Sequence, residues 1–207
     1  MTDVEADRAS GRPPRQARGR VRREAIIDAA AQIVAADGPE ALTIHAAARR
    51  AGASIGSMYH FFQNRDALLE ALMQRHHAAL AEISAQSRQI TLETWRKMTA
   101  EEVIGRVFGR PLDYFAGHRD ALALVTLQDS ARADEFQELL LQVMVARLGE
   151  TIGAKSAVTL FAVCAGTLFF LRETQLGGKD SASRDIPKVL TAYLAAVERA
   201  IAGDKAS

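Results

Sequence analysis

The segment from Leu42 to Phe62 constrains the fold more than any other part of the chain, because it holds start and stop signals for two short helices in succession. Thr43 stands where its hydroxyl can accept a backbone N–H in the first turn of a helix, and Ser54 stands likewise before a second helix. Between them, Gly52 permits the positive φ that a tight turn needs. Two short helices joined by a turn of three or four residues form a helix-turn-helix.

A longer helix is predicted on each side of this unit. Before it, apolar residues recur at helical spacing from Ile26 to Val34. Asp37-Gly38-Pro39 should end that helix, since Gly favours a left-handed C-terminal cap and Pro cannot continue the helix. After the unit, Asn64 is expected to cap a long connecting helix. The apolar positions of this connecting helix are Leu68, Leu69, Leu72, Leu80 and Ile83.

The rest of the chain shows neither strand alternation nor an internal repeat, so an all-α fold is expected. A low content of Gly and Pro, 14 and 5 of 207 residues, agrees with this prediction. The remaining helices are predicted near residues 93–117, 119–130, 133–151, 154–176 and 186–202. Breaks between them are expected at Gly117, Gly177-Gly178 and Ile186-Pro187. Pro111 is expected to kink the helix over 93–117.

Residues 1–20 have no hydrophobic periodicity and are expected to form a flexible basic arm, with order beginning near Val21. Seven arginines occur from Arg8 to Arg23 without an intervening acidic residue, although the whole chain has a net charge of only +1. Such a block binds polyanions or stays solvated, and the sequence leaves both alternatives open.

A cytoplasmic location without membrane association is expected. The first twenty residues lack the apolar stretch of a signal peptide, and Asp3, Glu5 and Asp7 argue against a transit peptide. Residues 156–171 are apolar, but they fall short of the roughly 20 residues that span a bilayer, so a buried or interface helix is predicted. Cys164, the only cysteine, is expected to pack inertly, and no metal or cofactor is expected.

The start of the second short helix has the residue types that entry into a major groove requires. Bulky side chains there would hold the backbone away from the base edges, whereas Ser54, Gly56 and Ser57 are small. Serine hydroxyls can bond base edges or phosphates, and Ile55 could touch a thymine methyl. Gly56 costs about 1 kcal/mol of helix propensity relative to Ala. Close approach to DNA or close packing on the preceding helix would explain that glycine equally well.

Further polar residues nearby are candidates for phosphate contacts, which position a helix without reading sequence. Tyr59 and His60 follow one turn later, and Arg65 begins the connecting helix, whose unpaired N–H groups also attract phosphate. Each residue has an ordinary alternative when considered alone: Tyr59 could pack, His60 could be solvated and Thr43 could serve only as a cap. The full set of candidate DNA-binding residues is Thr43, Ser54, Ile55, Gly56, Ser57, Tyr59, His60 and Arg65.

In combination these motifs resemble the tetracycline-repressor (TetR) family of bacterial transcription regulators. The resemblance covers residues 22–72, with the Leu-Thr start, the Ala-Gly turn, the Gly-x-x-Tyr-x-x-Phe segment and the Leu-Leu pair of LTIHAAARRAGASIGSMYHFFQNRDALLEAL. It implies a helix-turn-helix DNA-binding domain over residues 21–67 and a helical effector-binding and dimerisation domain over residues 68–207. It further implies a homodimeric repressor of transcription that binds a palindromic double-stranded DNA operator and is released by a small-molecule effector. Arg65 stands where the family usually has Lys.

The effector is expected to be apolar or amphipathic and of moderate size. Aromatic residues on helices are also typical of a plain core, so the lining is hard to predict from sequence. Phe115, Phe169 and Thr126 are secondary candidates for this pocket. The principal candidate effector-binding residues are Trp95, Phe108, Tyr114, His118, Met144 and Phe161.

A homodimer through residues of about 154–202 is the expected assembly. Leu190, Tyr193, Leu194, Val197 and Ile201 form a continuous apolar seam on the last predicted helix. In the preceding helix, Ala162 and Gly166 would allow a neighbouring backbone to come close. These helices could pair with a second copy as a four-helix bundle, or they could bury against their own domain.

Two other function classes compete with a ligand-responsive regulator. An all-helical enzyme is disfavoured, because the chain has no His-Glu-x-x-His helix, no Gly-rich phosphate loop and no Gly-x-Ser-x-Gly elbow. An architectural DNA-binding protein without an effector is the closer alternative. The two DNA-binding classes differ in whether a metabolite releases the DNA.

Overall fold

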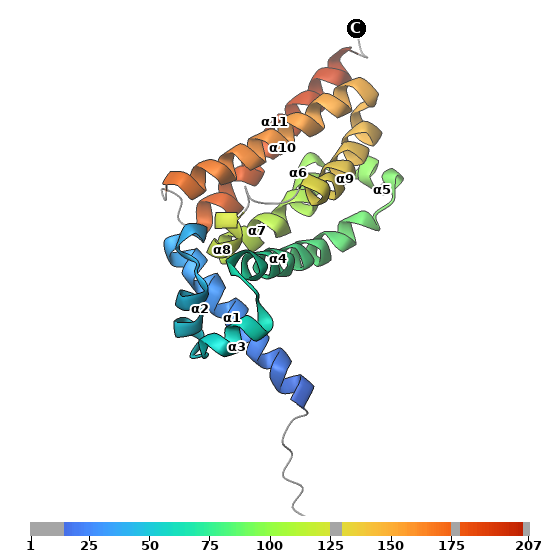
Figure 1. Cartoon of the computed structure of the whole chain (residues 1–207). Coiled ribbons are helices and arrows are strands. Elements are labelled where there is room, and N and C mark those ends of the chain that lie inside the picture. Colours follow the sequence, from blue (N-terminus) through green and yellow to red (C-terminus); the bar gives the residue numbers. More distant parts are fainter. Residues whose placement is uncertain (1–14, 125–129, 175–178, 205–207) are drawn as a thin grey trace, which may run out of the picture.

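The computed structural model describes the backbone of residues 15–124, 130–174 and 179–204, all of whose regular structure is helical (Figure 1). The predicted all-α fold is therefore confirmed. The elements are α1 (Arg15–Asp37), the 3-10 turn η1 (Pro39–Ala41), α2 (Ile44–Ala51), α3 (Ile55–Phe61), α4 (Arg65–Arg88), α5 (Leu92–Lys97), α6 (Ala100–Ile104), the π-helical segment η2 (Gly105–Gly109), α7 (Arg110–Gly117), α8 (Arg119–Leu124), α9 (Ser130–Leu148), α10 (Glu150–Thr174) and α11 (Lys179–Asp204).

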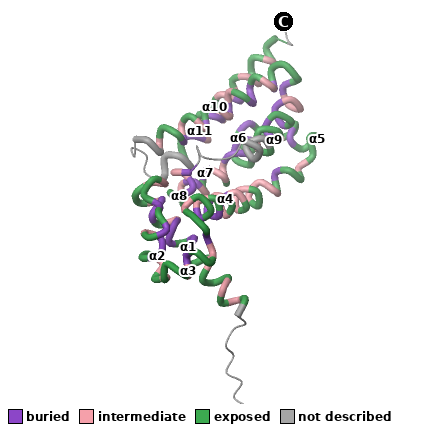
Figure 2. Tube along the Cα trace, viewed as in Figure 1, coloured by how far each residue is buried: buried purple, intermediate pink, exposed green. Residues whose placement is uncertain are grey.

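The buried residues form two cores, one at each end of the molecule (Figure 2). The N-terminal core lies among α1, α2, α3 and the first half of α4, and it includes Ile26, Leu42, Met58 and Leu68. The C-terminal core lies among the helices from α5 onward. We call these two parts the N-terminal unit and the C-terminal unit, and α4 runs from one into the other (Figure 1).

The caps predicted for the N-terminal unit are confirmed. The Ala46 N–H donates to Thr43 Oγ1 over 3.0 Å, and the Ser57 N–H donates to Ser54 Oγ over 3.2 Å. At the start of α4 the Ala67 N–H donates to Asn64 Oδ1 over 2.8 Å. Gly38 and Gly52 have φ values of 82° and 61°, as the two predicted turns require.

Some predicted boundaries are wrong. Helix α1 begins at Arg15, before the expected start near Val21, so residues 15–20 are helical; residues 1–14 lie outside the described residues. The helix predicted over 93–117 is divided at Met98, because a capping box starts a new helix there. In it the Thr99 N–H donates to Glu102 Oε2 over 2.7 Å, and the Glu102 N–H donates to Thr99 Oγ1 over 3.2 Å. The bonds that the Thr99 N–H and hydroxyl donate to the Glu102 carboxylate lower the pKa of Glu102.

One predicted proline effect differs from the structure and the other stays a prediction. Pro111 follows the irregular π-helical segment η2 within the helical run from α6 to α7, and its predicted kink is not tested by these assignments. Pro187 does not break the chain but lies inside α11. Ile186 and Leu190 on either side of it are buried in the C-terminal core, and their packing holds the helix together across the proline. The break predicted at Gly177-Gly178 lies outside the described residues.

Helices α9, α10 and α11 form one face of the C-terminal unit (Figure 1). Residues 150–171 of α10 are long and apolar enough to cross a membrane by composition alone. In the structure α10 packs against α9 and α11 and buries Leu160, Cys164 and Leu168. The first turn of α10 lies so close to the end of α9 that a Cβ on Gly153 would sit 2.6 Å from the Met144 carbonyl oxygen.

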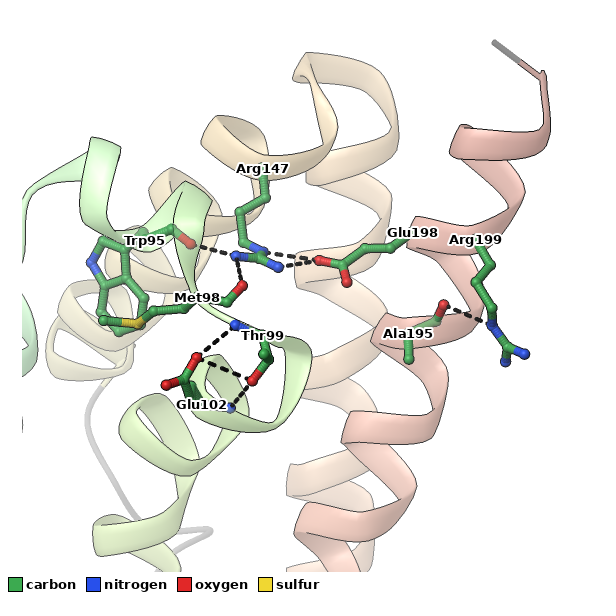
Figure 3. A network of polar contacts seen from close by, with 8 residues as sticks. All are labelled: Trp95, Met98, Thr99, Glu102, Arg147, Ala195, Glu198 and Arg199. Carbon is green, nitrogen blue, oxygen red and sulfur yellow. Dashed lines mark hydrogen bonds and ion pairs between the residues drawn. The ribbon is translucent and has the colours of Figure 1, made fainter. Parts of the chain in front are cut away.

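The end of the C-terminal unit farthest from α1 is held by Arg147 of α9 (Figure 3). Its guanidinium donates to the backbone carbonyls of Trp95 and Met98, the latter over 2.8 Å, and it pairs with Glu198 of α11. The Nε–H of Arg147 reaches Glu198 Oε1 over 3.0 Å. Because the Arg147 side chain is only 6% exposed, this pairing fixes α5, α9 and α11 to one another.

Candidate nucleic-acid interface and internal cavity

Helix α3 is anchored on one side and open on the other. Met58 and Phe62 are buried in the N-terminal core, and Phe61 packs against that core. On the opposite side Ile55 is 37% exposed and Tyr59 is 51% exposed. Packing was the alternative role for Tyr59, but about half of this residue is exposed, so packing does not account for the whole side chain. Ser54, Gly56 and His60 are exposed on the same helix, and Ser57 is half-buried.

The capping hydroxyls keep a proton to donate. Thr43 Oγ1 and Ser54 Oγ each accept a backbone N–H, which uses an oxygen lone pair and leaves the O–H hydrogen available. Both residues are exposed. Capping and donation to a phosphate or a base edge are therefore compatible roles for the same side chain.

Packing within the protein does not explain the glycine at position 56. A Cβ built on this residue would meet no atom within 4 Å, so packing against α2 does not require a glycine. The alternative of close helix packing is thereby removed. Close approach of DNA to the start of α3, the other explanation for this glycine, stays a prediction.

Arg65 first serves the fold. Its Nε–H donates to the Leu42 carbonyl over 3.0 Å and its Nη2–H donates to the Pro39 carbonyl over 2.8 Å. These bonds tie the start of α4 to the η1 turn. Its Nη1–H points to the exposed Asp66 carboxylate over 3.3 Å, so a role on a phosphate stays a prediction for this residue.

The extended start of α1 adds positive charge that the sequence analysis assigned to a flexible arm. Arg18, Arg20 and Arg22 are exposed on this helix, whose N-terminal end projects beyond α2 and α3 (Figure 1). Arg23, one turn further in, lies over the Phe62 ring with its Cζ 5.3 Å from the ring centroid. The spacing of the arginines fits a helix, but a flexible coil was predicted for this segment because it contains Gly19 and follows Pro13 and Pro14.

Residues 26–72, which span α1 to α4, match the family model of bacterial regulatory proteins, tetR family. The matched segment is thus a TetR-type helix-turn-helix DNA-binding domain, as the sequence motifs implied. Among curated proteins, no sequence matches the chain.

Several solved structures share the fold of this chain. A TetR-like transcriptional regulator from Rhodococcus sp. RHA1 is 19% identical with a TM-score of 0.65, over 89% of this chain and 99% of that one. FadR from Bacillus subtilis in complex with stearoyl-CoA is 19% identical with a TM-score of 0.56, over 82% and 97%. A protein from Saccharomonospora viridis in complex with choline is 16% identical with a TM-score of 0.63, over 83% and 94%.

The C-terminal unit encloses a cavity of about 430 Å³ between α4, α7, α9 and α10. Phe108 and Phe161, two of the predicted effector-binding residues, line it, and Phe115 does so too. The ring of Phe136 lies between the first two, with centroid distances of 5.4 Å to Phe108 and 6.3 Å to Phe161. The lining is therefore mainly aromatic and aliphatic.

Four predicted effector-binding residues do not line the cavity. Trp95 and Met144 are fully buried in the C-terminal core, where α5 packs on α9. Tyr114 lies on the side of α7 that faces α4, with its hydroxyl 2.8 Å from His76 Nδ1, and His118 stacks on the Tyr114 ring at 4.0 Å. Of the secondary candidates, Phe169 is exposed and Thr126 lies outside the described residues.

A stripe of α4 that the sequence analysis missed supplies one wall of the cavity: Gln74, His77, Ala81, Ser84 and Arg88. Their spacing of three and four residues places them on one helix face, a signal that was present in the sequence. Arg88 crosses the cavity rim to Glu135 of α9 over 2.6 Å. This rim therefore contains both charge signs beside a mainly apolar lining.

Cys164 lines the cavity as well as packing in the C-terminal core. Burial raises the pKa of its thiol to about 12, so at neutral pH the thiol stays protonated and reacts slowly, which agrees with the inert packing that the sequence predicted. Among the described residues, no cluster of three His, Cys, Asp or Glu side chains is placed to hold a metal ion.

Proposed function

We propose that the protein is a homodimeric repressor that binds a palindromic DNA operator through the exposed start of α3, and that an apolar or amphipathic molecule in the cavity releases it. The open surface at Gly56, flanked by exposed Ser54, Ile55 and Tyr59, is the observation that carries the DNA-binding part. Small residues at the tip allow base contacts, while the phenol and hydroxyl groups around it reach phosphates.

The homodimer is supported by an exposed apolar surface on α10 and α11. Val158 is 70% exposed, and Phe170 and Val189 are 56% and 57% exposed. Ala162 and Gly166 on α10 are exposed too, and a Cβ on Gly166 would meet no atom within 4 Å. The seam predicted on α11 contributes less than expected, because Leu190 and Leu194 are buried in their own C-terminal core.

The effector part of the proposal is supported by the cavity. Its volume of about 430 Å³ falls within the range of about 300–1,000 Å³ that is usual for small-molecule sites. FadR from Bacillus subtilis, which shares the fold, was solved with stearoyl-CoA, an amphipathic molecule with a long acyl chain. A cytoplasmic location and the absence of catalysis belong to the same proposal, because a repressor acts by occupying DNA.

Selection of bound duplexes from a random pool tests the DNA-binding part. We expect enrichment of an inverted repeat whose half-sites lie about one helical turn apart, because a dimer of helix-turn-helix units has two-fold symmetry. Ser57→Ala should change base preference, whereas Tyr59→Phe should weaken all selected duplexes alike. Enrichment of unrelated single sites, or none, would contradict the proposal.

The dimer surface is tested by Val158→Asp, with Leu92→Asp on α5 as a matched control at an exposed leucine. Sedimentation of the first variant should show a monomer, and its affinity for the selected duplex should fall, while the control should stay dimeric. A dimeric Val158→Asp variant with unchanged affinity would show that copies meet elsewhere.

A further inference from the structure

Helix α8 joins the two units of the molecule. Leu124 at its end is 1% exposed and belongs to the N-terminal core, whereas Ala121 one turn earlier is fully buried in the C-terminal core. The helix packs against α1 on one side and α7 on the other, and it also touches α4. A movement of α7 or α4 therefore reaches α1 through this short helix.

A chain of polar side chains crosses the same place, and we call it the junction cluster: Asp28, Arg75, His76, Tyr114 and Asp120. His76 of α4 lies 2.8 Å through Nδ1 from the Tyr114 hydroxyl of α7, and 2.9 Å through Nε2 from Asp120 Oδ2 of α8. The neighbouring Arg75 lies 2.5 Å through Nη1 from Asp28 Oδ1 of α1 and 3.9 Å through Nη2 from Asp120 Oδ2. The cluster thus connects α1, α4, α7 and α8.

The pKa shifts of Asp120 and Tyr114 fix the protonation states of the carboxyl and phenol groups of the cluster. Burial alone would raise the pKa of the Asp120 carboxyl, but the hydrogen bond and charge of His76 and the N–H groups at the start of α8 outweigh it and lower that pKa. Asp120 is therefore an ionised acceptor, and the Nε2–H of His76 donates to it. Burial and the Asp120 charge raise the pKa of Tyr114, so the phenol stays protonated beside His76 Nδ1.

The cavity lining and the junction cluster take neighbouring residues from the same two helices, α4 and α7. On α4, Gln74 and His77 line the cavity, while Arg75 and His76 between them belong to the cluster. On α7, Phe115 lines the cavity and Tyr114 belongs to the cluster. A molecule that pushes α4 away from α7 must therefore stretch the bond between His76 and Tyr114.

We propose that the junction cluster transmits occupancy of the cavity to the DNA-binding helices. The inference rests on the proposed function and adds the side chains through which it is regulated. With the cavity unoccupied, the cluster holds α4, α7 and α8 in the relation that α1 and the helix-turn-helix need for operator binding. A molecule that separates α4 from α7 breaks the hydrogen bond between His76 and Tyr114. The resulting displacement of α4 then reaches α1 through the bond between Arg75 and Asp28. The residues of the cluster act as positioning residues and do not contact DNA or effector.

Cys164, the only cysteine, offers a way to fill the cavity without knowing the effector. Hexyl methanethiosulfonate transfers its hexylthio group to the Cys164 thiolate, forms a disulfide and releases methanesulfinate. Because the thiol pKa is about 12, the modification is run at pH 9 and the protein is returned to neutral pH. Mass spectrometry verifies a single adduct, and a reducing agent removes it. Affinity for the selected duplex is then measured at fixed salt.

For the wild-type protein we expect the hexyl adduct to weaken operator binding about 5- to 150-fold, the usual range of allosteric coupling, and reduction to restore it. In Tyr114→Phe and Arg75→Gln the adduct should change affinity less than about twofold. Arg96→Gln is the matched control, because Arg96 makes one exposed bond to the Ala146 carbonyl far from the cluster, and it should respond as the wild type does. Melting curves verify that each variant is folded.

The outcomes separate this inference from the proposed function. If the unmodified wild type binds no duplex, or the adduct leaves its affinity unchanged, the proposed function fails and the inference with it. If the wild type responds and both cluster variants respond equally, the proposed function stands and the role of the junction cluster is refuted. The smaller adduct from methyl methanethiosulfonate should weaken binding less in the wild type, and an equal effect of both adducts would also count against cavity filling.

Discussion

The N-terminal and C-terminal units are built from the same element, the helix, but they use it differently. In the N-terminal unit the capped helices α2 and α3 pack with α1 and the start of α4 around a filled core at Leu42 and Met58. In the C-terminal unit α4, α7, α9 and α10 surround an open volume of about 430 Å³. A surface that must match a DNA groove needs a single rigid arrangement of its helices. A site that responds to a small molecule needs space for the ligand and helices that can rearrange.

The boundary between the units is where that difference matters. Asp120 and His76 are buried there between two apolar cores, with each polar atom paired. Buried polar networks fix one arrangement when all members are bonded and become costly when one bond is lost. The junction is thus suited to a two-state response, which neither core alone would provide.

The largest expected effect is on unfolding free energy, when one leucine of each unit is replaced by alanine. Leu68→Ala removes a fully buried side chain from the filled N-terminal core and should cost about 3–5 kcal/mol of unfolding free energy. Leu139→Ala at the cavity wall should cost about 2 kcal/mol, since its side chain already lacks neighbours on one side. Denaturant titration followed by circular dichroism measures both, and equal losses would mean that the cavity is not an open volume in solution.

A second comparison concerns the junction. Asp120→Asn should cost about 2 kcal/mol at neutral pH, because it removes a charged acceptor from His76. The folded pKa of Asp120 lies below its ordinary value of 3.8, so its stabilisation is full above about pH 4 and is lost as the pH falls through the folded pKa. Unfolding of wild type and variant should therefore converge at low pH. A constant difference from pH 7 to pH 2 would disprove the ionised pair.

The smallest expected change in stability is for alanine substitutions at two glycines that have open space around them. Gly52 in the helix-turn-helix has φ of 61°, so Gly52→Ala should cost about 1 kcal/mol from backbone strain alone. Gly105 in the C-terminal unit has φ of −59°, so Gly105→Ala should add up to about 1 kcal/mol of stability. Thermal melting of the two variants checks the opposite signs, and shifts in the same direction would reject the argument.

The sequence predicted the N-terminal unit well because its signals are local. Thr43, Ser54 and Asn64 each cap the residue three positions ahead, a distance that sequence alone specifies. The break at Thr99 was missed although the Thr-x-x-Glu pattern was present, since continuous helical periodicity across it dominated. Burial on both sides of Pro187 is a tertiary effect that no local pattern records.

The cavity was predicted only in part for a related reason. Helical spacing shows that Tyr114 and Phe115 are neighbours, but not that one faces α4 and the other faces the cavity. Trp95 and Met144 are apolar like the true lining, and their distance from the cavity follows from how α5 packs on α9. Which side of a helix meets a void depends on partners that are distant in sequence.

Hydroxyl-radical footprinting of the selected duplex tests the central claim most directly. If two copies of the chain present α3 to successive major grooves, the protein should protect two patches on one face of the duplex, centred about 34–36 Å apart. A single protected patch, or continuous protection without a two-fold centre, would contradict a dimer that reads DNA through α3.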